Sequence, residues 1–173
     1  MKRKRVFDAI VKGSLLLYNY GRKKVQQWIV TITTTCSCCW TTTCSRWTTM
    51  WIPYNPNPLG LKVGDCTVRA ICAATNASWD DVHKALCDRA REMADMPSAD
   101  RVWWSLLEDL GFTRKRMIDR CPECYTVKDF CRDHPHGTYI LGPREHVVCV
   151  IDGNYLDSWD SGETIPTIYF TRR

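Results

Sequence analysis

Residues 65–75 read DCTVRAICAAT, and this stretch predicts a buried helix near the start of the folded part of the chain. The small and apolar side chains of Cys66, Ala70, Ile71 and Ala74 recur at helical spacing. Cys66 falls in the first turn, where a helix N-terminus stabilises negative charge and lowers the pKa of a thiol. Cys66 is therefore a candidate nucleophile, and the backbone N–H groups beside it are candidate donors to an oxyanion.

Two further helices and a short one are expected after this stretch. Ser78 is predicted to cap a helix that carries an apolar face, and Ser98 is predicted to open the next. Gly111 is expected just past the end of that helix, where glycine is favoured. Thr126 is predicted to cap a short helix that stops before Pro135.

The periodicity then changes from helical to alternating. Short β-branched and aromatic runs occupy residues 138–141, 146–151, 155–159 and 165–170. Asp152-Gly153-Asn154 between the second and third runs is typical of a tight hairpin. The pattern predicts an α+β fold in which N-terminal helices pack on a C-terminal antiparallel sheet.

Composition changes sharply near residue 51. The chain has 173 residues, enough for one sizeable core, and its 45% hydrophobic and 25% charged residues exclude fibrous and wholly disordered classes. Residues 1–50 carry nine Lys or Arg and one acid, a net charge of +8, whereas the remainder has a net charge of −3. We expect a basic, Thr/Cys-rich, disordered leader over residues 1–50 and a single domain over 51–173. A membrane-surface or nucleic-acid contact, or a mis-assigned start codon, are the alternatives for the leader.

The eleven cysteines are an odd number, and no convincing secretion signal accompanies them, which favours a reducing compartment. No stretch approaches the length of uncharged apolar sequence that spans a bilayer, so no transmembrane segment is expected. Because the folded part is mildly acidic, specific nucleic-acid binding is not expected there. Cys72, Cys87 and Cys149 lie on apolar faces and are predicted to be core residues. The oligomeric state is left open.

A candidate base and a candidate orienting group follow Cys66 in the chain. His146 begins a predicted strand, and Asp157 lies on the strand expected to pair with it. A carboxylate there would fix the tautomer of the imidazole and hold the ring, as in nucleophile–base–orienter arrangements. The order Cys, His, Asp in these element positions predicts nucleophilic catalysis by a thiol.

This arrangement resembles the papain-like cysteine peptidase superfamily. The resemblance lies in a helix-initial Cys66, a strand-initial His146 and the following Asp157-Ser158-Trp159, which is similar to that superfamily's Asn-Ser-Trp. Residues 54–58, 64–66, 121–125 and 146–148 also resemble a small uncharacterised family from phages and gut bacteria. The resemblance covers residues 51–173 and implies a papain-like fold with a Cys66–His146–Asp157 triad.

The expected function is a cysteine protease-like thiol hydrolase that cleaves an amide or peptide bond in a peptide or protein substrate, in the cytoplasm of a bacterial or phage-infected cell. The alternatives are an inactive papain-like binding or inhibitory module, or a related acyl transfer such as peptidoglycan amide cleavage, deamidation or transglutamination. Papain-like enzymes usually carry an oxyanion-donating Gln six residues before the nucleophile, where this chain has Gly60, so Asn57 or Asn55 is expected to replace it. Asp160, followed by Ser-Gly, is the alternative third member of the triad.

A second cysteine cluster has the spacing of a zinc half-site. Cys121 and Cys124 are separated by two residues, and Cys131 with His134 or His136 could supply the remaining ligands. A reduced or disulfide pair and ordinary packing are the alternatives. No cofactor is expected to be required for the reaction, and a structural zinc ion is one interpretation of this cluster.

Overall fold

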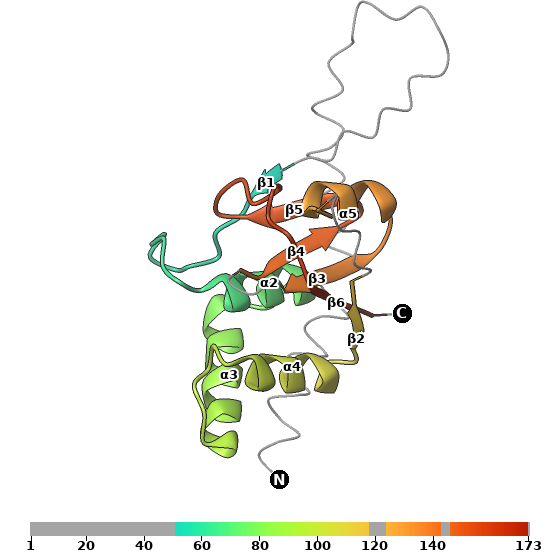
Figure 1. The fold of residues 1–173 in the computed structure, drawn as a ribbon. Helices are drawn as coiled ribbons and strands as arrows, with labels where there is room; N and C mark the ends of the chain where they lie inside the picture. The colour runs from blue at the N-terminus through green and yellow to red at the C-terminus, as the bar shows by residue number, and fades with distance from the viewer. Residues whose placement is uncertain (1–50, 118–123, 143–145, 173) are drawn as a thin grey trace, which may run out of the picture.

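The computed structural model describes residues 51–117, 124–142 and 146–172, and these form a mixed α+β fold. The predicted leader, residues 1–50, lies outside the described residues, as does Cys121. In the described part, four helices accompany one six-stranded sheet (Figure 1). The helices are α2 (Cys66–Thr75), α3 (Trp79–Met93), α4 (Asp100–Asp109) and α5 (Val127–Asp133). The strands are β1 (Trp51–Pro53), β2 (Thr113–Arg116), β3 (Thr138–Gly142), β4 (Val148–Ile151), β5 (Asn154–Asp157) and β6 (Ile168–Thr171).

Local capping chemistry sets three helix ends where the sequence predicts them. The Ser78 hydroxyl accepts the backbone N–H of Asp81 at 3.1 Å, and Thr126 forms a complete capping box at the start of α5. Gly111 follows α4 with a φ of +82°, a left-handed conformation that suits glycine. The prediction that Ser98 opens α4 is off by one residue, because Ala99 occupies the N-cap and no side chain caps this helix.

The sheet has the order β1-β5-β4-β3-β6-β2, and all neighbours are antiparallel except β1 and β5. The expectation of a wholly antiparallel sheet following the helices is therefore wrong in two places. The strand β1 precedes the four described helices and pairs in parallel with β5. The strand β2, whose four residues are all exposed, lies between α4 and α5 and pairs with β6.

The hairpin between β4 and β5 is confirmed. Asp152 has a φ of +47° and Gly153 a φ of +75°, and two successive positive φ values are what a two-residue turn of this twist requires. The turn sets the register in which Ile151 pairs with Asn154 and Cys149 with Leu156. This register brings the start of β4 beside the end of β5.

The sheet is covered on both faces (Figure 1). On one face, α2, α3 and α4 pack on a core that includes Ile140, Cys149 and Phe170. On the other, α5 packs on Leu141, Val148 and Val150, the residues that alternate with the first set along β3 and β4. Cys72 and Cys149 are fully buried, as predicted. Cys87 is only half-buried and contacts His83 on α3, so its assignment to the core is wrong.

No helix in the described ranges has the combination of length and apolar character that crossing a membrane demands.

Candidate active site

Three elements bring the predicted nucleophile, base and orienting group to one place. Cys66 is the first residue of α2, which packs against β4 and β5. His146 lies two residues before β4 begins, and Asp157 is the last residue of β5. Because β4 and β5 are antiparallel neighbours, the segment that enters β4 and the end of β5 lie side by side.

His146 interacts with both Asp157 and Cys66. Its Nε2 forms a hydrogen bond with Asp157 Oδ2, and its interaction with the Cys66 thiol helps to raise the pKa of the imidazole. Because Nε2 is occupied by Asp157, Nδ1 is the ring nitrogen left to serve the thiol. The ring of Trp159, an exposed residue, lies 5.0 Å from the His146 ring, centre to centre. The imidazole is thus held between a sulfur and a carboxylate, with 13% of the side chain exposed.

The electrostatics favour a charged pair. Burial alone would raise the pKa of the Cys66 thiol, but hydrogen bonds from His146 and from the Val147 backbone, together with the imidazole charge, bring it below its ordinary value. Burial alone would lower the pKa of His146, but the hydrogen bonds to Asp157 and Cys66 raise it to about 9. Cys66 and His146 can therefore exist as thiolate and imidazolium near neutral pH.

Asp157 is fully buried and surrounded by donors. Its Oδ2 accepts the Ser161 hydroxyl at 2.6 Å in addition to His146, and its Oδ1 accepts the Ser158 backbone N–H at 2.7 Å. Arg69 also donates to Oδ1, from Nη2 at 3.0 Å and from Nε at 3.2 Å. Burial would raise the pKa of this carboxyl, but the His146 and Ser161 hydrogen bonds and the charges of His146 and Arg69 lower it. Asp157 is therefore ionised and held in one orientation.

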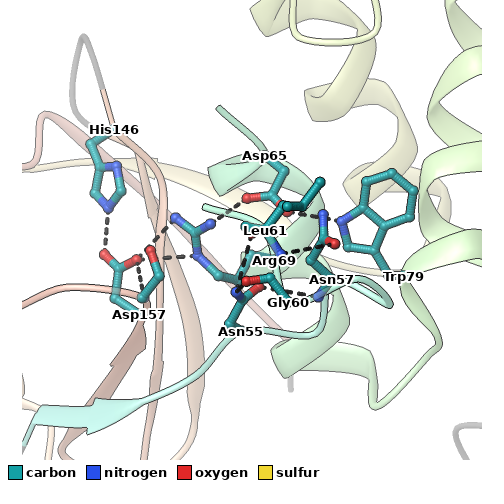
Figure 2. Close-up of polar contacts among 10 residues, drawn as sticks. Asn55, Asn57, Gly60, Leu61, Asp65, Arg69, Trp79, His146 and Asp157 are labelled. Carbon is teal, nitrogen blue, oxygen red and sulfur yellow. Dashed lines mark hydrogen bonds and ion pairs between the residues drawn. The ribbon is translucent and has the colours of Figure 1, made fainter. Parts of the chain in front are cut away.

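Neither Arg69 nor its second ion-pair partner, Asp65, is predicted from the sequence to take part in the site. Figure 2 shows the Arg69 guanidinium between two carboxylates, with Asp157 and His146 on one side and Asp65 on the other. Arg69 Nη1 bonds Asp65 Oδ1, and Asp65 Oδ2 accepts the Trp79 Nε1–H at 2.9 Å. The available signal was one charged residue within an otherwise apolar helix, four residues after an acid.

The backbone of Asp157 is anchored by the first described strand and the residue after it. Its carbonyl oxygen accepts the Trp51 Nε1–H at 3.1 Å and the Tyr54 backbone N–H at 2.9 Å. Both donors come from the segment that forms β1 and leads out of it. The parallel pairing of β1 with β5 therefore also fixes the main chain at Asp157.

The alternative third member, Asp160, is engaged elsewhere. Its Oδ1 accepts the Tyr155 hydroxyl and the Gly162 backbone N–H, the latter at 3.2 Å. His146 instead forms its hydrogen bond with Asp157, which also accepts a hydrogen bond from the Ser161 hydroxyl.

The two candidate oxyanion asparagines shape the loop that precedes Cys66. The Asn55 amide nitrogen donates to the carbonyl oxygens of Gly60 at 3.3 Å and Leu61 at 3.2 Å. Asn57 Oδ1 accepts backbone N–H groups from Leu59 at 3.0 Å and Leu61 at 3.3 Å. The Asn55 amide group therefore donates hydrogen bonds within the loop, whereas the Asn57 side chain accepts hydrogen bonds there through its oxygen.

The residues of the suggested zinc cluster lie in different surroundings. Cys131 lies on the buried face of α5, and burial raises the pKa of its thiol to about 12. His134 stacks on Phe130 at 3.9 Å between ring centres, and its Nδ1 bonds the Phe130 carbonyl at 3.0 Å. Cys124 is exposed. Within the described residues, no group of three or more His, Cys, Asp or Glu side chains is placed to hold a metal ion. The zinc interpretation also needs Cys121, so it stays a prediction.

Comparisons of the chain with protein-family models, with curated proteins and with solved structures found no match.

Proposed function

We propose that this chain is a cysteine-dependent hydrolase of papain-like architecture that cleaves an amide or peptide bond. The observation that carries the proposal is the position of His146, whose Nε2 forms a hydrogen bond with the buried Asp157 carboxylate and whose imidazole lowers the pKa of the Cys66 thiol. A nucleophile, a base and an orienting group that interact in this order are what acyl transfer through a thiol needs. A peptide or protein would be the substrate, and no cofactor enters the steps.

In the proposed mechanism the Cys66 thiolate attacks the carbonyl carbon and forms a C–S bond. The carbonyl oxygen becomes an oxyanion, which the backbone N–H of Cys66 and the Asn57 amide would stabilise. The His146 imidazolium gives its proton to the leaving nitrogen as the C–N bond breaks, which leaves a thioester and a free amine.

Hydrolysis of the thioester completes the cycle. Neutral His146 takes a proton from water, and the resulting hydroxide attacks the thioester carbon. The C–S bond then breaks, the acid is released and Cys66 returns as the thiolate paired with imidazolium. Throughout, Asp157 keeps the ring in the orientation that presents Nδ1 to sulfur.

Two measurements on the full chain test this proposal. Iodoacetamide alkylation, followed by peptide-resolved mass spectrometry at pH 6 to 7, should modify Cys66 at least about tenfold faster than the exposed Cys124, because only thiolates react. Incubation with a mixed peptide library should yield cleaved products with the native chain and none with Cys66→Ala. Cleavage that survives Cys66→Ala, or alkylation of Cys66 no faster than of Cys124, would refute the assignment of the nucleophile.

A further inference from the structure

A buried cation joins the site to a second buried carboxylate. Arg69 is 4% exposed, Asp65 is 6% exposed and Asp157 is 0% exposed. A buried charge is costly unless it is paired, and here one guanidinium pairs with both carboxylates. Arginine suits such a place because its planar group donates in several fixed directions.

The geometry divides the oxygens of Asp157 between two partners. Arg69 donates to Oδ1 from both Nε and Nη2, whereas His146 bonds Oδ2. A rotation of the carboxylate would break the Arg69 contacts, so the guanidinium holds Oδ2 toward the imidazole. Arg69 lies three residues after Cys66 and therefore projects from the same side of α2 as the nucleophile.

The charges around the thiol also depend on Arg69. Asp65 immediately precedes Cys66, and its negative charge would oppose a thiolate at the next residue. The Arg69 ion pair offsets that charge. Three further titratable groups belong to, or pack against, the same core cluster as Cys66: Cys72 on α2, Cys149 on β4, and Tyr54. Burial raises the pKa of all three, so they are uncharged at neutral pH, and the charges of Asp65 and, less strongly, Asp81 at the start of α3 add to the rise for Cys72.

We propose that Arg69 is a positioning residue for the Cys66 site, which orients Asp157 toward His146 and offsets the charge of Asp65 beside the thiol. This inference rests on the proposed function, because it assigns Arg69 a part in generating the nucleophile. It gives the Asp65–Arg69–Asp157 network a role in reactivity as well as in folding.

The two partners of one ion pair should then have opposite effects on reactivity. Loss of the Arg69 charge destabilises the thiolate, so the inflection of the reactivity profile at which Cys66 loses its proton moves to higher pH. Loss of the Asp65 charge does the reverse, and this inflection moves to lower pH. A purely structural ion pair would instead make both variants less stable, with the profile in place.

The experiment measures the pH dependence of Cys66 alkylation by iodoacetamide in the full chain, with peptide-resolved detection, for the native sequence, Arg69→Met, Asp65→Asn and Arg69→Lys. We expect the Cys66 inflection to shift by about one pH unit upward for Arg69→Met and downward for Asp65→Asn. Arg69→Lys keeps the charge and should stay near the native profile. Circular dichroism melts report whether each variant is folded.

Shifts in the same direction for Arg69→Met and Asp65→Asn, or no shift in either, would overturn the inference. If Arg69→Met does not fold, Asp65→Asn decides: a downward shift supports the role of Arg69, and an unchanged profile overturns it. Failure of the proposed function looks different, because native Cys66 would then react no faster than Cys124 at any pH. If native Cys66 is reactive but the profiles of the variants do not shift, only the proposed role of Arg69 is refuted.

Discussion

Replacing Asp157 with asparagine removes one charge from the site and keeps the shape of the side chain. The carboxylate accepts donors at both oxygens, from Arg69 and Ser158 at Oδ1 and from His146 and Ser161 at Oδ2. An amide has a single oxygen, so one pair of donors must face its NH₂ group. The buried guanidinium has the stronger demand for an acceptor, and the NH₂ should therefore turn toward His146.

This orientation destabilises the imidazolium. An NH₂ group beside Nε2 requires that nitrogen to accept, which excludes the doubly protonated ring. The contacts of the native site raise the pKa of His146 from 6.5 to about 9, a difference of about 3 kcal/mol. Since the hydrogen bond to Asp157 is the largest contribution that raises this pKa, we expect it to fall below 7 in the variant. Loss of the imidazolium should in turn raise the pKa of Cys66 and slow its alkylation at pH 7 by roughly 100-fold.

The assay follows the His146 ring protons by NMR across pH 5 to 10, together with alkylation of Cys66. Asp160→Asn is the matched control, since Asp160 lies in the same loop but bonds Tyr155 and Gly162. This control should leave the titration of His146 unchanged. If Asp157→Asn keeps a His146 pKa near 9, or if Asp160→Asn lowers it as much, the reasoning about the orienting carboxylate fails.

Three further predictions concern stability. Phe130→Ala empties a fully buried position between α5 and the sheet and should lower the free energy of unfolding by about 3–5 kcal/mol in urea; a loss below 1 kcal/mol would contradict the packing. Gly153→Ala places a Cβ at a φ of +75°, within 3.3 Å of Pro135 Cα, and should cost about 1–2 kcal/mol in the same assay, with an unchanged midpoint as the contrary result. The raised pKa of His146 adds stability that is present below pH 6.5 and is lost as the pH rises through about 9, whereas the lowered pKa of Cys66 has the opposite effect in that window. Native stability should therefore fall less steeply over this range than the stability of Cys66→Ala, in which the opposing contribution of Cys66 is absent; parallel pH profiles for the two proteins would argue against a charged pair.

Features set by nearby residues were predictable from sequence. The caps at Ser78 and Thr126 depend on a hydroxyl and a backbone N–H three residues away. The turn at Asp152-Gly153 depends on two positive φ values that these residue types tolerate. The buried helix that begins at Cys66 was visible in its apolar spacing. In each case the interaction that decides the structure lies within one or two turns of chain.

Features set by distant residues were not. The strand β2 has the sequence TRKR, with no apolar alternation, and becomes a strand by pairing with β6 more than fifty residues later. The strand β1 is three residues long and pairs with β5 across about a hundred residues. Arg69 is the corresponding case at the candidate site, because only the tertiary fold brings Asp157 to it. For Cys87 the sequence predicts too much burial. Its helical spacing indicates a core position, but in the packed structure it is only half-buried on α3.

The short edge strand β1 sets a limit on how far this chain could be shortened. The carbonyl of Asp157 is held by the Trp51 indole and the Tyr54 amide, so the segment farthest upstream in the described chain supports the residue that orients the base. A protein that starts at Tyr54 would lack the indole and the parallel pairing, although Cys66, His146 and Asp157 would all remain in its sequence. Trp51 is thus the last position at which the chain can begin and still retain every contact described for Asp157. A protease that cut within β1 would weaken the site without touching any residue of the proposed triad.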